Sequence, residues 1–450
     1  MHTVFWKDLS TAVFQEDIPA PNISHMGRLA GPLPVSELLA ETVGLVGVAL
    51  TRLCDQPFGQ LNVDGRLSAL WGVTSCEPIG WELPESWDLL SGAYKGADGW
   101  IRLHTNAVRH KSATLRVLGA LGTKQAVAKA ISGHAVAPLE EEILAHGGAA
   151  ARMIPWKKWQ KHPQGRAIAQ SPMIEWTEKS AVAPNHLFQS DFCSERPLSG
   201  IKVLDLTRVL AGPIATRTLA GFGAHVLRID PADWDELGLL HDTTVGKRCA
   251  ELDLSNSADR LQFETLLSEA HILVHGYRPG AMDQLGYDRG TLDKINPAHI
   301  NVSLSAYGWY GPWSERRGFD SLVQFSAGIA ELCSDPSGTP GKLPVQALDH
   351  AAGYIMAACC LEALNIARRG RVVAARTSLA QIAWLLCRTN QVKPATAPIR
   401  SATQSDYVRG IEQSEWGGLK RLRPPLSMPF AQMRWDLPAG SLRRHCAKWG

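Results

Sequence analysis

The sequence has no marked excess of charge of either sign, and its cysteines follow no pattern typical of metal sites or disulfide frameworks. The 46 Lys and Arg residues nearly balance the 43 Asp and Glu residues, which gives a formal net charge of +3. That balance argues against a protein built to bind nucleic acid or a membrane surface. The nine cysteines include no CxxC pair and are odd in number. No metal site and no disulfide framework is therefore predicted, and a reducing cytoplasm is the expected compartment.

Long apolar runs are also missing. The longest uncharged one, AAGYIMAACCL at 351–361, is far shorter than the ~20 residues of a membrane span. The first residues, MHTVFWKDLSTAVFQED, lack a basic start followed by an apolar core, so no signal peptide is predicted. With 450 residues, 45% of them hydrophobic, the chain is long enough for two or three domains with cores of their own.

Two polar, proline-containing stretches, 183–199 and 388–405, are predicted to be linkers. Between them, strand-like and helix-like stretches alternate. This alternation predicts right-handed βαβ units and a mostly parallel sheet, with ligands bound at the carboxyl ends of the strands. Ser255 or Ser257 is expected to cap the helix ADRLQFETLLSEA. The predicted strands are the apolar stretches 201–206, 224–230, 248–254, 271–277 and 299–308.

The region before the first linker is more helical. Ser36 is expected to cap a long helix, and residues 99–105 are expected to form a strand followed by helices near 107–120 and 138–147. Because residues 37–71 faintly resemble residues 349–384, an internal repeat is a further hypothesis. The chain would then join the back half of one copy to the front half of another.

A turn after the first strand of the second region, VLAGPIATR at 209–217, opens a helix with Pro213 expected at its first position. Its amides could bind an anion, but ordinary βα-loop geometry explains the turn equally well. The sequence lacks GxGxxG, so a nicotinamide site is not predicted. Asp230 could bind a ribose, and Lys247 or Arg278 a phosphate. Each of these residues could equally be structural or lie on the surface.

One carboxylate has two competing interpretations. In GPWSERRGFDSL, residues 311–322, Asp320 directly precedes an apolar stretch. It could cap the helix that starts there, with Gln324 as its capping-box partner, or it could be chemically active. Asp349 before HAAGYIM allows the same cap interpretation. No Ser-His-acid arrangement and no metal-ligand spacing stands out.

The ordered set of motifs from 198 to about 385 resembles the class III CoA-transferases of the CaiB/BaiF type. LSGIKVLDLTRVLAGPIATRTLAGFGAHVLRID at 198–230 is similar to the opening of this family, which includes formyl-CoA transferase and α-methylacyl-CoA racemase. The similarity continues through GKRCAELDL, HGYRPGAMDQLGYD, RRGFDSLVQFSAG and LDHAAGYIMAACCLEAL. The resemblance implies an α/β fold with a Rossmann-like parallel sheet in a large domain, a smaller α+β domain and an interlocked homodimer.

The resemblance also implies roles for single residues. Asp320 occupies the position of the family's nucleophile in its RxGxD stretch. At two of the CoA-binding positions this sequence departs from the family, with Gly276 where an asparagine is usual and Gln284 where a basic residue is usual. The implied CoA-binding residues are Val209, Leu210, Ala211, Pro231, Gly276, Arg278 and Gln284.

The modules resemble those of the family in a changed order. Residues 90–119 and 159–176 resemble the small domain and the segment after it, which family members place behind the catalytic part, and 415–435 resembles a family C-terminus. Residues 1–183 are predicted to pack against the catalytic region and to form part of the acyl pocket. The expected domains are 1–190 (small-domain-like and returning segment, a degenerate first copy), 198–400 (Rossmann-like and catalytic) and 401–450 (C-terminal tail).

The implied activity is transfer of CoA from an acyl-CoA to a carboxylic acid through an aspartyl anhydride and an aspartyl-CoA thioester. The CoA thioester is a substrate, no permanently bound cofactor is expected, and neither nucleic acid nor a membrane is an expected partner. One alternative is an acyl-CoA racemase or epimerase. Family racemases carry a His directly before the aspartate, where this chain has Phe319, although Asp349 matches their other acid. A second alternative is a non-catalytic, degenerate family member.

Overall fold

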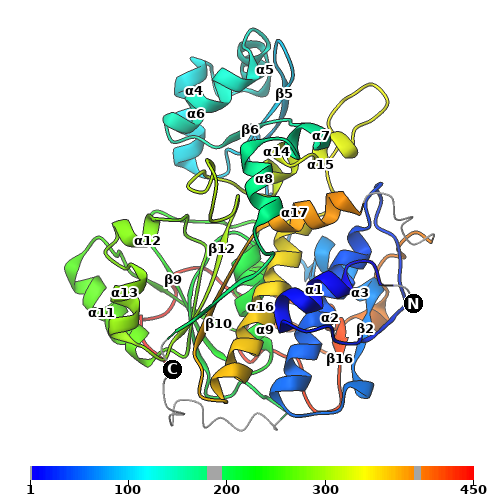
Figure 1. Ribbon diagram of the computed structural model, residues 1–450, viewed down its shortest axis with the longest axis vertical. Helices are drawn as coiled ribbons and strands as arrows, with labels where there is room; N and C mark the ends of the chain where they lie inside the picture. The colour runs from blue at the N-terminus through cyan, green and yellow to red at the C-terminus, as the bar shows by residue number, and fades with distance from the viewer. Residues whose placement is uncertain (1–2, 180–194, 390–396) are drawn as a thin grey trace.

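The computed structural model describes residues 3–179, 195–389 and 397–450 (Figure 1). Much of each predicted linker, residues 183–194 of the first and 390–396 of the second, lies outside these ranges. A small unit of helices and strands lies above a larger body that is built around a central sheet (Figure 1).

The central sheet has seven strands in the order β10-β9-β8-β11-β12-β13-β7. All neighbouring pairs are parallel except β13 with β7, which is antiparallel. The prediction of an α/β fold with a mostly parallel sheet is therefore confirmed. The strands are β7 (Glu175–Glu178), β8 (Lys202–Leu206), β9 (His225–Asp230), β10 (Lys247–Glu251), β11 (Ile272–His275), β12 (Ile300–Ser305) and β13 (Val373–Ser378).

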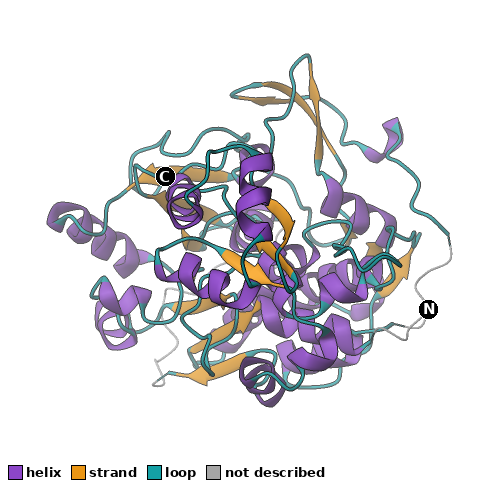
Figure 2. Ribbon diagram, turned by 90° about the horizontal axis from the view of Figure 1, so that it is seen from above, coloured by secondary structure: helices purple, strands orange, loops and turns teal. Residues whose placement is uncertain are grey.

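Helices cover both faces of this sheet (Figures 1 and 2). One face packs against α9 (Ala211–Gly221) and α16 (Ala347–Ala367), which also contact each other. The cap predicted for α11 is wrong by one residue, since Asn256, not Ser255 or Ser257, accepts the hydrogen bond from Ala258 N. The helices of the other face are α11 (Ser257–Glu269), α12 (Ala281–Gln284) and α13 (Arg289–Ile295), and α10 (Leu240–Thr243) follows β9.

Helix α16 is the central apolar helix of the molecule. It is the one described helix that is long and apolar enough to cross a membrane by length and composition, with a mean hydropathy of 1.2 in its most apolar window. That window is 94% buried inside the protein, so the apolar residues of α16 form core contacts. Its neighbours include α14 (Asp320–Ser326) and α17 (Leu379–Arg388), and α15 (Ile329–Leu332) follows α14 in the chain.

The small unit is an α+β domain, as predicted. Its antiparallel sheet consists of β4 (Gly92–Lys95), β5 (Trp100–Leu103) and β6 (Ala150–Arg152). The strand predicted at 99–105 is β5, and the two predicted helices are α4 (Val108–Leu118) and α6 (Val136–Ala145). A further helix, α5 (Lys124–Ser132), completes the unit.

The small unit is docked directly onto α14. Ala149 and Ala151 share a buried apolar cluster with Leu322 and Phe325 of α14, and Ile154 N donates to the Phe325 carbonyl at 2.9 Å. From there α7 (Trp156–Trp159) and α8 (Pro163–Gln170) lead the chain down to β7 at the edge of the central sheet. The predicted packing of the first region against the second is present within one chain.

The two similar segments fold alike. The first forms α2 (Val35–Leu53), β2 (Asn62–Asp64) and α3 (Gly65–Val73), which matches the order α16, β13, α17 of the second. Asp64 caps α3 and Ser378 caps α17, each at the end of the preceding strand. The cap predicted for α2 is wrong, because Pro34 is its N-cap and the Ser36 hydroxyl accepts from Leu29 N.

The C-terminal tail pairs with the first region. Strand β15 (Gly417–Arg421) lies between β14 (Glu412–Ser414) and β3 (Cys76–Ile79), and β16 (Leu426–Ser427) is antiparallel to β2. The first region in turn contributes a strand to the central sheet, because its β7 pairs antiparallel with β13 of the second region. The remaining elements near the N-terminus and the tail are α1 (Trp6–Phe14), β1 (Asn22–Ser24) and the 3-10 turns η1 (Phe58–Gln60) and η3 (Gln404–Asp406).

Candidate active site

Asp320 is the first residue of α14 and is only 1% exposed. The interpretation of Asp320 as the cap of its own helix is wrong, since the N-cap is Phe319 and no side-chain cap bond is made. Its Oδ2 instead accepts from the amides of Leu348 at 2.9 Å and Asp349 at 3.1 Å. These amides belong to the first turn of α16, where backbone N–H groups have no partner within the helix. The nucleophile candidate therefore caps a neighbouring helix.

Gln324 fixes the other oxygen of Asp320. Its Nε2 donates to Asp320 Oδ1, and its Oε1 accepts from Leu343 N at 2.9 Å. Both groups of the amide are thereby engaged, which holds the Asp320 carboxylate in one orientation. Gln324 was expected as a capping-box partner, and its observed role is to orient the carboxylate.

The two buried carboxyl groups have raised pKa values. Burial raises the pKa of Asp320 to about 6, against the opposing effect of hydrogen bonds from Gln324 and the amides of α16. Burial, and then the charge of Asp320, raises the pKa of Asp349 well above its ordinary range. Because the charge of Asp320 raises the pKa of Asp349, Asp349 is the member of the pair that holds its proton more tightly. The cap interpretation of Asp349 is also wrong, since the N-cap of α16 is Gln346.

A cavity of about 430 Å³ lies at the carboxyl ends of the strands. Phe319 and Asp349 line it, and Asp320, which follows Phe319 and accepts from the Asp349 amide, is not itself a lining residue. Pro231 is not among the lining residues, and its carbonyl accepts from Trp234 N at 3.3 Å. Six of the seven residues implied for CoA binding do line the cavity: Val209, Leu210, Ala211, Gly276, Arg278 and Gln284.

The loop between β8 and α9 carries backbone strain beside this cavity. Val209 has a φ of 67°, a left-handed conformation that is unfavourable for a β-branched residue. Glu236 stabilises it by accepting from Val209 N at 2.6 Å. Strain of this kind concentrates at functional sites. The strained residue is one of those implied for CoA binding.

Three local expectations for this loop and its neighbours are corrected. Pro213 is the third residue of α9, not the first, because the helix starts at Ala211. Asp230 is not free for a ribose, since Arg228 donates to both of its oxygens at 2.8 and 3.0 Å. Lys247 is fully buried and donates to Asp205 Oδ2 at 3.1 Å, so it supports the core and does not face a phosphate.

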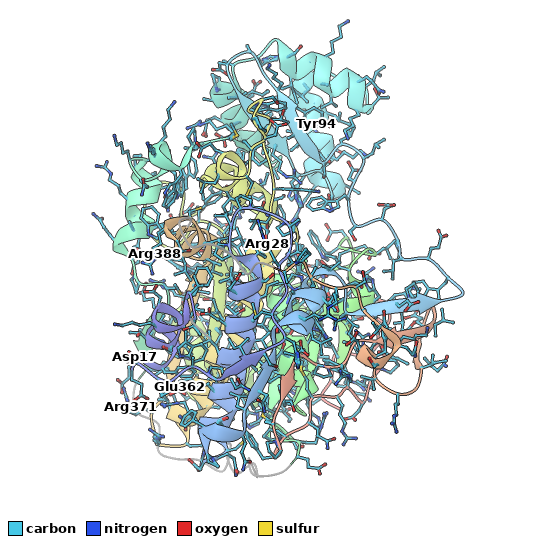
Figure 3. All side chains as sticks on the ribbon, turned by 90° about the vertical axis from the view of Figure 1, so that its right-hand side faces the viewer. Asp17, Arg28, Tyr94, Glu362, Arg371 and Arg388 are labelled. Carbon is cyan, nitrogen blue, oxygen red and sulfur yellow. The ribbon has the colours of Figure 1, made fainter. Side chains whose placement is uncertain are left out.

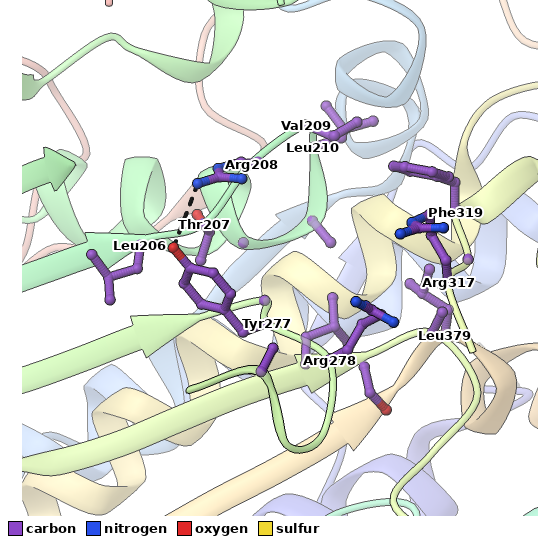
Figure 4. Close-up of a pocket in the computed structure, with 18 of the residues that line it drawn as sticks. Leu206, Thr207, Arg208, Val209, Leu210, Tyr277, Arg278, Arg317, Phe319 and Leu379 are labelled. Atoms are coloured by element: carbon purple, nitrogen blue, oxygen red, sulfur yellow. Dashed lines mark hydrogen bonds between the residues drawn. The ribbon is translucent and has the colours of Figure 1, made fainter. Parts of the chain in front are cut away.

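Four arginines line the cavity, and only Arg278 was singled out from the sequence. The Arg208 guanidinium lies 5.0 Å from the centre of the Trp234 ring and is hydrogen-bonded to the Tyr277 hydroxyl at 3.4 Å (Figure 4). Arg317 lies beside Phe319 (Figure 4) and donates to the Gly148 carbonyl at 3.1 Å. The fourth is Arg109, from the first turn of α4 in the small unit.

The small unit also places two histidines against Phe319. The His104 ring stacks on the Phe319 ring at a centroid distance of 3.8 Å and an interplanar angle of 7°. The His110 ring meets Phe319 edge-on at 5.7 Å. Burial lowers the pKa of His104 to about 3, so its imidazole is neutral. Local sequence could not reveal these contacts, because more than 200 residues separate the partners.

From the sequence, the amides around Ser321 and Gly308 are candidate donors to a developing oxyanion. The Gly308 amide donates to Ser305 Oγ at 3.0 Å, so it is already engaged. The amides of Leu348 and Asp349, which the sequence did not suggest, are the ones that point at the carboxylate of Asp320. In the part of the chain that the structure describes, no group of three or more His, Cys, Asp or Glu residues could hold a metal ion.

Comparison with known proteins agrees with the family predicted from the motifs. Residues 198–409 match the model of CoA-transferase family III. This part of the chain is similar to CoA-transferase family III.

Three relatives illustrate the similarity. An acetyl-coenzyme A transferase of Hypoxylon pulicicidum is 38% identical over 141 residues, which are 30% of this chain and 24% of that protein. An acetyl-CoA:oxalate CoA-transferase of Acetobacter aceti is 31% identical over 38% of this chain and 47% of that protein. A Mycobacterium tuberculosis protein named as a fatty acyl-CoA transferase is 31% identical over 38% of this chain and 46% of that protein. The aligned part of this chain thus spans less than half the length of each of these relatives.

Crystal structures of the mycobacterial protein are among the solved structures that match. One of them has a TM-score of 0.40 and 31% identity, and the match covers 44% of this chain and 57% of that chain.

Proposed function

We propose that this protein transfers CoA from an acyl-CoA thioester to a carboxylic acid, with Asp320 as the nucleophile. One observation carries the proposal. The Asp320 carboxylate is fixed by two amides of α16 directly behind a cavity lined by Val209, Leu210 and Ala211, the loop implied for CoA binding. A carboxylate suits the reaction because it is nucleophilic at neutral pH and is itself a good acyl leaving group.

The proposed cycle begins with attack of an Asp320 oxygen on the thioester carbonyl carbon. The carbon–sulfur bond breaks, and a mixed anhydride and CoA thiolate form. The thiolate then attacks the Asp320 carbonyl carbon, which releases the donor acid and leaves an aspartyl-CoA thioester. The acceptor carboxylate attacks that thioester to form a second anhydride, and the returning thiolate takes the acceptor's acyl group while Asp320 is restored.

The amides of Leu348 and Asp349 have a defined role in this cycle. They hold Oδ2 of Asp320, and we assign the attack to Oδ1, which Gln324 Nε2 orients. Once the carboxyl carbon of Asp320 becomes tetrahedral, the negative charge develops on the oxygen that these amides already bind. Donors aimed at a developing oxyanion commonly contribute two or more orders of magnitude to the rate.

The arginines that line the cavity support a CoA ester as the substrate. Arg208, Arg278, Arg317 and Arg109 approach the cavity from different elements, and guanidinium groups bind phosphate oxygens with two parallel hydrogen bonds. We assign Arg208, which lies beside Trp234 and Tyr277, to the phosphates of CoA. A homodimer and the absence of a permanently bound cofactor stay predictions, and the contacts around Phe319 already form within one chain.

The experiment is a screen of acyl-CoA donors against free acids. Acetyl-CoA and succinyl-CoA are incubated separately with oxalate, glutarate and malate, and new CoA esters are identified by mass. A small carboxylate acceptor is expected, since one relative is named for oxalate. The proposal is wrong if no pair yields a new CoA ester while the purified protein remains folded.

Racemisation is the second candidate, because Asp349 lines the same cavity and has a raised pKa. Phe319 occupies the position where family racemases carry a proton-transferring histidine. A branched acyl-CoA incubated with the protein in deuterated water is therefore expected to take up no deuterium at its α-carbon. Rapid uptake that disappears in Asp349→Asn would favour the racemase.

A further inference from the structure

His110 is a buried polar group for which the proposed cycle provides no role. It lies in the first turn of α4, is 1% exposed and lines the cavity. Within the described part of the chain, neither of its ring nitrogens has a hydrogen-bond partner. Buried polar atoms are normally paired, so an unpaired ring that faces a cavity indicates that a ligand supplies the partner.

The position of His110 indicates which part of the ligand it contacts. Its ring contacts the edge of Phe319, the residue directly before Asp320. Phe319 and Asp349 line the same cavity, and Asp320 lies behind them. The ligand group nearest to Asp320 during acylation is the thioester carbonyl. His110 is therefore on the side of the cavity where the acyl group must lie.

The charge state of the ring favours a neutral ligand group. Burial, and then the neighbouring Arg317, Arg109 and Arg278, lower the pKa of His110 to about 4. At neutral pH the ring carries one N–H donor and one acceptor nitrogen. An anionic group is bound better by a guanidinium than by a neutral ring, whereas a carbonyl oxygen needs a single neutral donor.

We propose that His110 is a substrate-binding residue whose ring N–H donates to the carbonyl oxygen of the acyl group carried by CoA. This inference rests on the proposed CoA-transferase function. It also gives the small unit, which comes from the first region of the chain, a direct part in acyl recognition.

The primary test measures how well the protein distinguishes acetyl-CoA from free CoA. Dissociation constants for both are measured by calorimetry in the full chain, with Asp320→Asn as the background so that no chemistry occurs. Relative to this background alone, His110→Ala should weaken acetyl-CoA binding about tenfold, the size of one lost hydrogen bond, and leave CoA binding unchanged. Equal weakening for both ligands, or none for either, would overturn the inference.

Three further variants separate hydrogen bonding from packing. His110→Gln keeps a donor and should restore part of the preference for acetyl-CoA. His110→Phe keeps a ring against Phe319 without a donor and should behave like His110→Ala, and binding at the level of the unsubstituted background would show that packing alone matters. The exposed His134 lies in the same unit, so His134→Gln should change neither constant and serves as the matched control.

A separate readout distinguishes failure of this inference from failure of the proposed function. Acylation of Asp320 is followed in the wild type by hydroxylamine trapping with acetyl-CoA and succinyl-CoA. If Asp320 is trapped but substitution of His110 does not change acetyl-CoA binding, only the role of His110 is contradicted. A His110-dependent preference without trapping keeps that role and contradicts the transfer mechanism.

Discussion

Two buried carboxylates in this molecule are built alike but placed differently. Asp320 accepts from the first-turn amides of α16, and Glu41 of α2 accepts from Val4 N at 2.7 Å and Phe5 N at 2.9 Å at the start of α1. Burial raises the pKa of Glu41 to about 7, as it raises that of Asp320 to about 6. Neither a raised pKa nor a capping role therefore marks a reactive carboxylate. Asp320 differs because it lies behind a cavity lined by arginines.

The same contrast holds for the two similar segments. Helices α2 and α16 pack side by side, and each leads through a strand into a capped helix. Both helices begin with the same two backbone hydrogen bonds, from Val35 and Leu38 in α2 and from Ala347 and His350 in α16. In α16 the amides of Leu348 and Asp349 also hold Asp320. The two segments thus share a fold, and the carboxylate on the first turn of α16 is what our proposal adds to it.

The largest expected effect follows from deleting the first region of the chain, which contains α2. A chain of residues 198–450 lacks α2, β7 and the small unit, so the apolar face of α16 and the edge strand β13 become exposed. Such surfaces lead to aggregation or to a requirement for a partner. We expect insoluble or inactive protein, with partial recovery when residues 1–197 are added as a separate chain. A soluble and fully active 198–450 would make the first region a separate domain.

The next effect separates the two carboxylates by activity. Asp320→Ala and Asp320→Asn should lower kcat/KM for CoA transfer by at least about 10³-fold, because the nucleophile is lost. Glu41→Gln, which alters the other buried carboxylate, should leave kcat/KM within about threefold of the wild type. Near-normal turnover of Asp320→Asn would show that the assigned nucleophile is wrong.

The raised pKa of Asp320 predicts how activity and stability change with pH. Since the pKa of Asp320 is raised to about 6, its carboxylate is protonated below that pH and kcat/KM should fall there. The folded state holds this proton more tightly than the unfolded chain. The stability that the proton contributes is complete below the ordinary pKa of 3.8 and is lost as pH rises to about 6. Asp320→Asn should therefore gain stability over the wild type between pH 4 and pH 6, measured by denaturant unfolding.

A smaller effect concerns the contact between α2 and α16. Arg52 of α2 donates to both oxygens of Glu362 in α16 at 3.0 and 3.1 Å, and Glu362 is almost fully buried. Glu362→Ala should lower the free energy of unfolding on the order of 2 kcal/mol, because Arg52 keeps only its exposed partner Glu16.

The matched control for Glu362→Ala is an exposed ion pair. Arg388 and Asp8 lie 2.6 Å apart with side chains 42% and 47% exposed, and Figure 3 shows Glu362 and Arg388 at separate places on the same side of the body. Arg388→Ala should cost less than about 0.5 kcal/mol. Equal losses in the two variants would mean that the contact between α2 and α16 is not strongly stabilised by this buried pair.

The smallest effect compares a glycine in each helix. A Cβ on Gly353 would lie 2.6 Å from the Ala211 carbonyl oxygen, which is backbone, whereas one on Gly47 would meet the movable side-chain ends of Leu61 and Leu426. Gly353→Ala should destabilise by about 1 to 2 kcal/mol and weaken CoA binding, since Ala211 belongs to the cavity loop. Gly47→Ala should affect stability only and by less. Unchanged CoA binding in Gly353→Ala would show that the contact between Gly353 and Ala211 does not influence the CoA site.

The local sequence predicted the strands of the central sheet, because residue preferences within each stretch determine them. The strands were found because their apolar, β-branched stretches suit a buried parallel sheet, and the motif around Asp320 was found as a resemblance. The caps were less predictable. Asn256 lies between the two serines that were considered, and the Ser36 hydroxyl is engaged by Leu29. Several polar residues near each helix start compete, and tertiary contacts decide between them.

The partners of the candidate site could not be read from local patterns. Asp320 is held by amides 28 and 29 residues away, and Phe319 meets His104 and His110 from a different unit. The packing of the small unit onto α14 brings the two histidines to Phe319, and the packing of α16 against α14 brings its amides to Asp320. The sequence indicated that the first region would complete the pocket, but it did not indicate which side chains would do so.

The most direct measurement is chemical trapping at Asp320. The wild type is incubated with acetyl-CoA or succinyl-CoA, treated with hydroxylamine, digested and analysed by mass. Hydroxylamine converts an aspartyl anhydride or an aspartyl thioester into a hydroxamate. We predict modification of Asp320 that requires the acyl-CoA, with Glu41 and Asp349 unmodified. Absence of the label at Asp320 in a protein that transfers CoA, or equal labelling without acyl-CoA, would contradict the covalent mechanism.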